Sequence, residues 1–140
     1  MSASPPESPW HLSETYKALI TLSVEALKML ALVNGGAAVA VLTYLGSLVA
    51  HGSMGAATPD MTPALRWYCG GLLATTLAFV VAYVTQLTLY NEEIKRRTGA
   101  RMRQYHGVGV SIGVILALFA AMVFGMGCLD AARALGSVHP

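Results

Sequence analysis

Three long stretches of the sequence contain no Asp, Glu, Lys or Arg, and they constrain the fold more than any other feature. They run from Met29 to Pro59, from Trp67 to Asn91 and from Gln104 to Leu129. A bilayer core is about 30 Å thick, so a helix that rises about 1.5 Å per residue crosses it in about 20 residues. Each stretch exceeds that length. With 55% hydrophobic and only 11% charged residues, the chain is too apolar for a soluble domain, and we predict an all-α integral membrane protein.

The apolar stretches divide the chain into eight predicted segments. Each stretch supplies one transmembrane helix, and an amphipathic cytoplasmic helix precedes the first of them, either continuous with it or bent into it. The segments are a disordered tail (1–8), the amphipathic helix (9–30), transmembrane helix 1 (31–51), an outer loop (52–63), transmembrane helix 2 (64–91), a basic cytoplasmic loop (92–105), transmembrane helix 3 (106–130) and a short outer tail (131–140).

The segment before the first span carries a narrow polar stripe on an otherwise apolar helix. Glu14, Lys17, Thr21, Glu25 and Lys28 recur at helical spacing, which places all five on one face. Such a helix either lies in the membrane interface or packs against partner helices with its stripe outward. A separate fourth span is the alternative, but each charge at mid-bilayer would cost about 2.5–3.5 kcal/mol on insertion scales.

Small and polar residues mark the point where this segment meets the first span. Asn34, Gly35 and Gly36 are consecutive, and small residues in membrane helices permit close packing. We favour a helix that continues through them with a bend. A hinge, or a reversal of the chain into two short spans, is the alternative. Gly35 and Gly36 are therefore candidates for helix packing.

The second and third spans carry further candidates for helix packing. In the second span we expect one polar and aromatic face to point at a neighbouring helix instead of lipid, with Gln86 forming an interhelical hydrogen bond; a contact of Gln86 with a substrate or ion is the alternative. The third span contains a GxxxG pair, Gly109 and Gly113, which favours close approach of helices and self-association. The face of the second span comprises Tyr68, Thr75, Phe79, Tyr83, Gln86 and Tyr90.

Basic residues cluster between the second and third spans, and this cluster sets the predicted orientation. Lys and Arg collect in cytoplasmic loops, so we expect this loop and the N-terminus in the cytoplasm and the C-terminus in the periplasm of a bacterial inner membrane. Contact with anionic lipid headgroups explains the cluster more simply than nucleic-acid binding, and we expect no nucleic-acid partner. Five of the nine basic residues belong to it: Lys95, Arg96, Arg97, Arg101 and Arg103.

Two cysteines and four histidines are the residues from which a reactive or metal site would have to be built. Cys69 and Cys128 fall near the predicted outer ends of two spans, so they either form a disulfide or pack as separate small residues. Their spacing matches no metal site, the histidines are far apart in sequence, and no nucleophile, phosphate-binding or dinucleotide motif is present. We therefore expect no catalytic residue, cofactor or metal.

Two classes of function remain for such a chain, and both involve the lipid bilayer. In the first, the protein is a structural or accessory subunit whose apolar faces bind a membrane protein partner. In the second, it is a homo-oligomer that forms a pore, a permeabilising effector or a small channel. The first is favoured, because no span carries a run of polar residues wide enough to line a water-filled pore.

Overall fold

A computed structural model describes residues 10–52, 58–97 and 106–137 of the chain. Within these ranges the chain is helical, and no strand occurs in them. Each helix is long and apolar enough to cross a membrane, which confirms the predicted all-α membrane fold. The helices are α1 (Trp10–Ala50), α2 (Thr62–Arg97) and α3 (His106–Gly136).

The first helix is continuous through the residues that the sequence marked as a possible break. α1 contains Asn34, Gly35 and Gly36 in its interior, so the amphipathic segment and the first span form one helix of 41 residues. The alternative of a chain reversal into a separate fourth span is wrong. A break in apolar surroundings would leave backbone N–H and C=O groups without partners, and this cost favours an unbroken helix.

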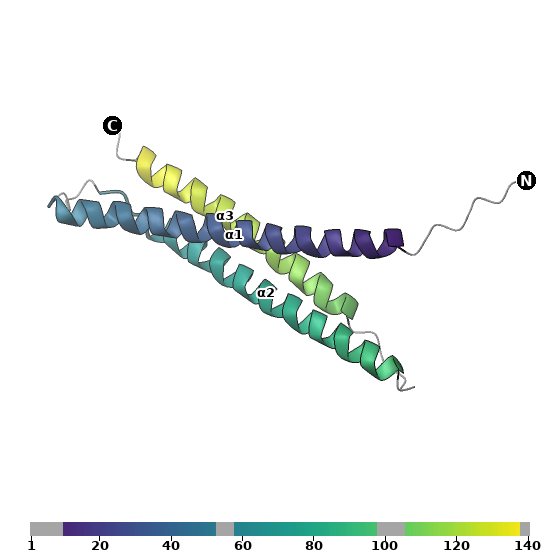
Figure 1. The fold of residues 1–140 in the computed structure, drawn as a ribbon. Helices are drawn as coiled ribbons and strands as arrows, with labels where there is room; N and C mark the ends of the chain where they lie inside the picture. The colour runs from purple at the N-terminus through teal and green to yellow at the C-terminus, as the bar shows by residue number, and fades with distance from the viewer. Residues whose placement is uncertain (1–9, 53–57, 98–105, 138–140) are drawn as a thin grey trace, which may run out of the picture.

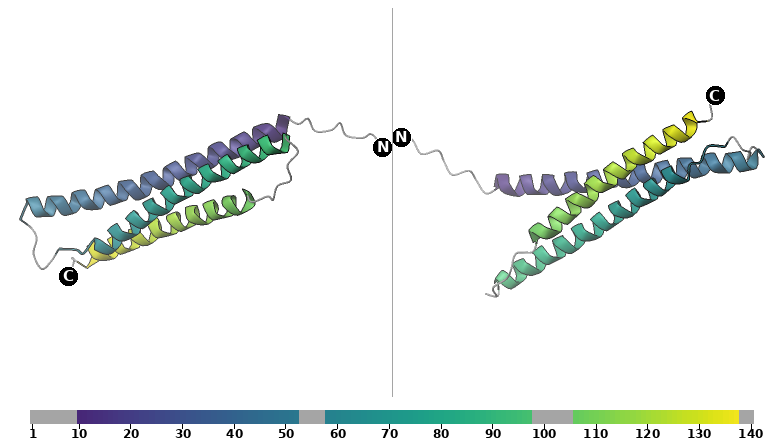
Figure 2. Two further views of the ribbon diagram at one scale, coloured as in Figure 1. Left: turned by 90° about the horizontal axis from the view of Figure 1, so that it is seen from below. Right: turned by 180° about the vertical axis from the view of Figure 1, so that it is seen from behind.

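The three helices form a pair crossed by a third (Figure 1). α2 and α3 lie side by side in antiparallel directions, whereas α1 packs mainly on α2 and touches α3 least. Two further views show that α1 crosses the pair obliquely (Figure 2), and its buried and half-buried residues among those described, apart from Ile20, lie between Leu27 and Leu48. A small core gathers at this crossing around Ala38, Ala64 and Tyr68, and the ring of Tyr68 lies 5.8 Å from that of Phe124, centroid to centroid.

The start of α2 is fixed by a capping residue and a proline. The backbone N–H of Thr62 donates to Oδ1 of Asp60 at 3.0 Å, which satisfies one of the unpaired donors at a helix N-terminus. Pro63 follows in the first turn, where its missing N–H costs no helical hydrogen bond. Hydrogen bonds from the side chain and backbone of Thr62, with a smaller effect of the charge on Arg66, lower the pKa of Asp60 from its ordinary value.

Two helices extend beyond the ends predicted for them. α2 continues past Asn91 to Arg97, and α3 continues past Asp130 to Gly136. At the end of α3, Arg133 pairs with Asp130 at 3.2 Å one helical turn away, and such pairs stabilise helices outside a bilayer. The end of a charge-free stretch therefore marks where the apolar span ends, but not where the helix ends.

Candidate functional site

Small residues spaced seven apart recur on the buried faces of α2 and α3. A seven-residue repeat keeps one face of each helix toward its partner, and small side chains let the two backbones approach closely. The sequence analysis predicts close packing from the GxxxG pair alone and does not contain this repeat. The residues of the repeat are buried or half-buried: Ala64, Gly71, Ala78 and Thr85 on α2, and Gly113, Ala120, Gly127 and Ala134 on α3.

The glycines of α3 differ in how closely they approach α2. A Cβ atom on Gly109 would overlap the hydroxyl of Thr85, and one on Gly127 would come within 2.6 Å of Cε1 of Tyr68. A Cβ on Gly113 would make ordinary contact with Val81 at 4.0 Å. The tight contacts are therefore made by one member of the GxxxG pair and by Gly127, which the sequence analysis did not select. Both contacts lie within one chain.

All three helices meet at Asn34, which is fully buried. Its Nδ2 donates to the carbonyl of Leu30 on its own helix at 3.0 Å and to that of Ala120 on α3 at 3.5 Å. Its Oδ1 is buried without a hydrogen-bond partner and lies against Gly71 of α2, where a Cβ would overlap it. The hydroxyl of Thr75, also fully buried, donates to the carbonyl of Gly71 at 2.8 Å. This junction sets the level at which α1 crosses the pair.

The two glycines after Asn34 make looser contacts than Asn34 itself. A Cβ on Gly35 would lie 3.9 Å from Cδ1 of Leu72, which is ordinary van der Waals contact. A Cβ on Gly36 would meet nothing within 4 Å. Close packing of α1 on α2 therefore depends on Asn34 seated against Gly71, and Gly36 faces open space.

The predicted polar and aromatic face of α2 is divided in the structure. Tyr68 and Thr75 are buried, but Gln86 is exposed, and Tyr83 and Tyr90 are 69% and 65% exposed. The prediction that the whole face points at a neighbouring helix of the chain is wrong for this second half. The residues of this face are on average more than 3.5 residues apart per helical turn, whereas a seven-residue repeat corresponds to 3.5 residues per turn. The face therefore rotates gradually away from the side of α2 that carries the seven-residue repeat.

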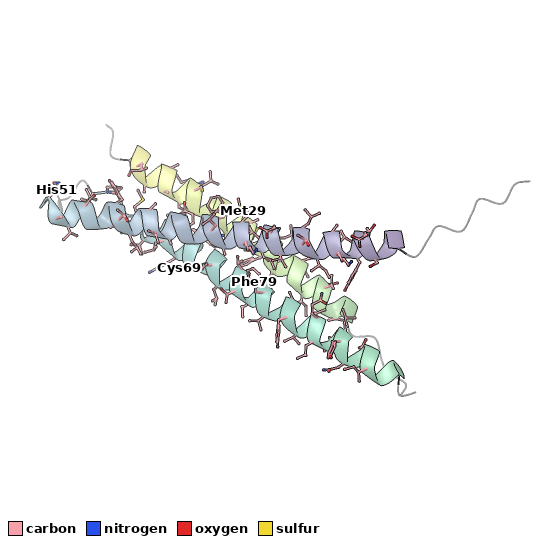
Figure 3. All side chains as sticks on the ribbon, in the orientation of Figure 1. Met29, His51, Cys69 and Phe79 are labelled. Carbon is pink, nitrogen blue, oxygen red and sulfur yellow. The ribbon has the colours of Figure 1, made fainter. Side chains whose placement is uncertain are left out.

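The N-terminal half of α1 has little contact with the rest of the chain. Residues 13–26 are exposed except for the half-buried Ile20, and side chains project around this part of the helix, on the N-terminal side of Met29 (Figure 3). Large apolar side chains are among them: Tyr16, Leu19 and Leu22 are 51%, 58% and 67% exposed. An apolar surface of this kind marks a site of interaction with protein or membrane.

The polar stripe of α1 contains two ion pairs. Lys17 pairs with Glu14 at 2.9 Å and Lys28 with Glu25 at 2.7 Å, each one turn apart on the exposed surface. Exposed pairs at this spacing contribute only about 0.3 kcal/mol to helix stability. Their main effect is to neutralise the stripe, so the unpartnered half of α1 presents little net charge.

The two cysteines, Cys69 and Cys128, are free thiols in the structure. Sγ of Cys128 accepts a hydrogen bond from the hydroxyl of Tyr68 at 3.5 Å. Cys69 is the residue after Tyr68, and successive residues of a helix project about 100° apart. Cys69 is consequently exposed on α2 (Figure 3) instead of facing Cys128.

Several predicted features concern parts of the chain outside the described residues. They include the disordered tail 1–8, the headgroup contacts of Arg101 and Arg103, and those of Lys95, Arg96 and Arg97, whose backbone belongs to α2 but whose side chains are not described. Among the residues that are described, no three His, Cys, Asp or Glu side chains gather as a metal site requires. Comparison of the chain with protein families, curated proteins and solved structures finds no match.

Proposed function

We propose that the protein is a structural or accessory subunit of a membrane complex, without a catalytic site of its own, and that it docks through the N-terminal half of α1. The length of α1 is the observation that carries the proposal. Its 41 residues extend about 60 Å, twice the thickness of a bilayer core of about 30 Å. Even at a tilt of about 40°, the upper end of the usual range, a large part of α1 would stand outside the hydrocarbon.

The continuity of α1 supports docking on a partner helix over a position of its amphipathic half in the membrane interface. A helix can lie in the membrane interface only if its axis runs along the bilayer plane. The C-terminal half of α1 is a span, and the helix continues through Asn34 without a break. The N-terminal half must then project from the membrane with Leu19, Leu22 and Tyr16 exposed to water. Cover by a partner helix removes that apolar surface from water.

The distribution of basic residues supports a cytoplasmic location for this projecting half. We propose a bacterial inner membrane, with the N-terminus in the cytoplasm and the C-terminus in the periplasm, because Lys and Arg concentrate between the second and third spans. A reporter fused at Ala100 should read cytoplasmic. A periplasmic signal at that position would reverse the orientation and place the docking half of α1 outside.

Purification from the native membrane tests the docking proposal. The tagged full chain is extracted in mild detergent at native expression, and the proteins that stay bound are identified and quantified by mass spectrometry. The double variant Leu19→Gln/Leu22→Gln makes the apolar surface polar while keeping good helix formers. Thr21→Gln changes the exposed polar stripe of the same turn and is the matched control.

We expect a stoichiometric membrane protein that is lost with the double variant and kept with Thr21→Gln. Recovery of copies of this chain alone would favour the homo-oligomeric pore instead, and conductance in reconstituted bilayers would then decide. Binding that the double variant leaves unchanged would show that α1 is not the docking element.

A further inference from the structure

An open groove of about 510 Å³ lies between α2 and α3, and every described residue that lines it belongs to one of these two helices. Its size falls within the range of small-molecule sites, about 300–1,000 Å³. The surface of the pair that packs with α1 is a different one, formed by Ala64, Tyr68 and Phe124. The groove is lined by Arg66, Trp67 and Gly70 on α2 and by Phe119, Val123 and Asp130 on α3.

The groove is charged at one end and apolar at the other. Arg66 is the last charged residue before the charge-free stretch of α2, and Asp130 is the first one after that of α3. These two residues therefore mark one boundary of the hydrocarbon core. From Asp130 to Phe119 the groove follows α3 for about 16 Å, close to the thickness of one leaflet, which is half of about 30 Å.

One basic and one acidic residue line the boundary end of the groove, and they differ in their partners. Oδ2 of Asp130 accepts a hydrogen bond from Nε1 of Trp67 at 2.9 Å, and Oδ1 pairs with Nη1 of Arg133 at 3.2 Å. Arg66 forms no ion pair within the described part of the chain, although its charge acts on Asp60. Both oxygens of Asp130 are thus engaged within the chain, whereas the guanidinium group of Arg66 is available to an anion.

We propose that this groove binds one anionic phospholipid, with the phosphate on Arg66 and an acyl chain along Gly70, Val123 and Phe119. The guanidinium group matches the geometry of a phosphate, and the indole of Trp67 lies at the level that Trp prefers in a bilayer. Gly70 leaves room for the chain, since nothing lies within 4 Å of the position of a Cβ there. The site is separate from the docking half of α1, so either proposal can fail without the other.

Trp67 makes lipid occupancy of the groove measurable by fluorescence. The chain has two tryptophans, so Trp10→Phe leaves Trp67 as the only one. The full chain carrying this change is reconstituted into phosphatidylcholine vesicles that contain increasing fractions of phosphatidylglycerol brominated on its acyl chains. Brominated phosphatidylcholine in the same vesicles measures contact with uncharged lipid.

We expect quenching of Trp67 to show about a fivefold preference for phosphatidylglycerol, the size of one headgroup contact with a basic residue. Arg66→Gln should abolish the preference and Arg66→Lys should restore most of it. Gly70→Leu should fill the groove and reduce quenching by both lipids. Gly125→Leu is the matched control, because Gly125 on α3 also faces open space and does not line the groove.

Equal quenching by both lipids, unchanged by Arg66→Gln, would overturn the proposal and indicate ordinary contact with bulk lipid. Relief of the quenching by added inorganic phosphate would also overturn it, because the site would then hold a free ion. Circular dichroism in detergent checks that each variant folds. If Gly70→Leu fails to fold, the comparison of Arg66→Gln with Arg66→Lys still decides, since Arg66 is exposed.

Discussion

Replacing Gly71 by alanine should separate α1 from the α2–α3 pair. The new Cβ would overlap Oδ1 of Asn34 and lie 2.6 Å from its Cγ. The short side chain of Asn34 cannot move aside easily, because Nδ2 is held by the carbonyls of Leu30 and Ala120 and the residue is fully buried. Relief of the overlap therefore requires α1 itself to shift away from α2.

The expected cost follows from three contributions. Overpacking of a close-packed site costs about 1–3 kcal/mol, and loss of the interhelical hydrogen bond to Ala120 adds about 0.6 kcal/mol. Alanine recovers about 0.5–1 kcal/mol, because glycine is the poorer residue in a helix interior. The net destabilisation by Gly71→Ala should thus be about 1–3 kcal/mol. Gly70→Ala, in open space, should keep only the helical gain and be neutral to slightly stabilising.

Unfolding in mixed micelles gives the free energy of unfolding of Gly71→Ala and of Gly70→Ala. The fraction of sodium dodecyl sulfate is increased stepwise, and the helix content is followed by circular dichroism. A double-mutant cycle identifies the cause, since Asn34→Ala removes the amide that the new Cβ would strike. In the Asn34→Ala variant, adding Gly71→Ala should lower the free energy of unfolding by little or nothing. Equal stability of Gly71→Ala and Gly70→Ala in the native background would refute the close contact between Asn34 and Gly71.

Three further predictions concern single residues. Gly127→Ala should destabilise the α2–α3 pair by about 1–3 kcal/mol, because its Cβ would overlap an aromatic ring of α2. Gly125→Ala should not destabilise the pair, because a Cβ there meets nothing within 4 Å. Thermal unfolding in detergent compares the two variants. The capping hydrogen bonds lower the pKa of Asp60, so its contribution to stability should be complete above the ordinary pKa of an aspartate and vanish as the pH falls through the lowered value. Asp60→Asn should abolish this part of the pH dependence of unfolding. Cys69 and Cys128 should both react with a maleimide in detergent without reductant, and labelling that requires prior reduction would reveal a disulfide.

The three helices could be predicted because a bilayer accepts few structures. The charge-free stretches at 29–59, 67–91 and 104–129 have to be helical where they cross the bilayer, since every backbone polar group in lipid needs an internal partner. The same constraint kept α1 continuous through its glycines. It does not act beyond the hydrocarbon, where α2 runs on to Arg97 and α3 to Gly136. At the end of α3 the pair of Arg133 with Asp130 stabilises the extension, and hydropathy does not report such a pair.

The contacts between helices were harder to predict, because they depend on register. A GxxxG pair is a feature of one helix and does not say which of its two glycines contacts the neighbouring helix more closely. In the structure Gly109 packs tightly on α2 and Gly113 does not, because the rotation of α3 about its axis brings Gly109 closer to α2. The repeat of small residues every seven positions in both helices was the available signal for that rotation. The sequence predicts a bend at Asn34 and not its contact with Gly71, because nothing in the sequence of α1 shows that Gly71 lies opposite the side-chain amide of Asn34.

Fluorescence of Trp10 provides a separate test of whether the N-terminal half of α1 stands off the membrane. Trp10 begins α1, and Met29, the first residue of the charge-free stretch, follows 19 positions later, or about 28 Å along the helix. With Trp67→Phe, Trp10 becomes the only tryptophan, and brominated lipids should leave its fluorescence unquenched, because a helix that crosses the bilayer without a break cannot also lay its N-terminal half along the bilayer surface. Strong quenching of Trp10 would mean that α1 bends onto the membrane, and the argument for a partner helix would lose its basis.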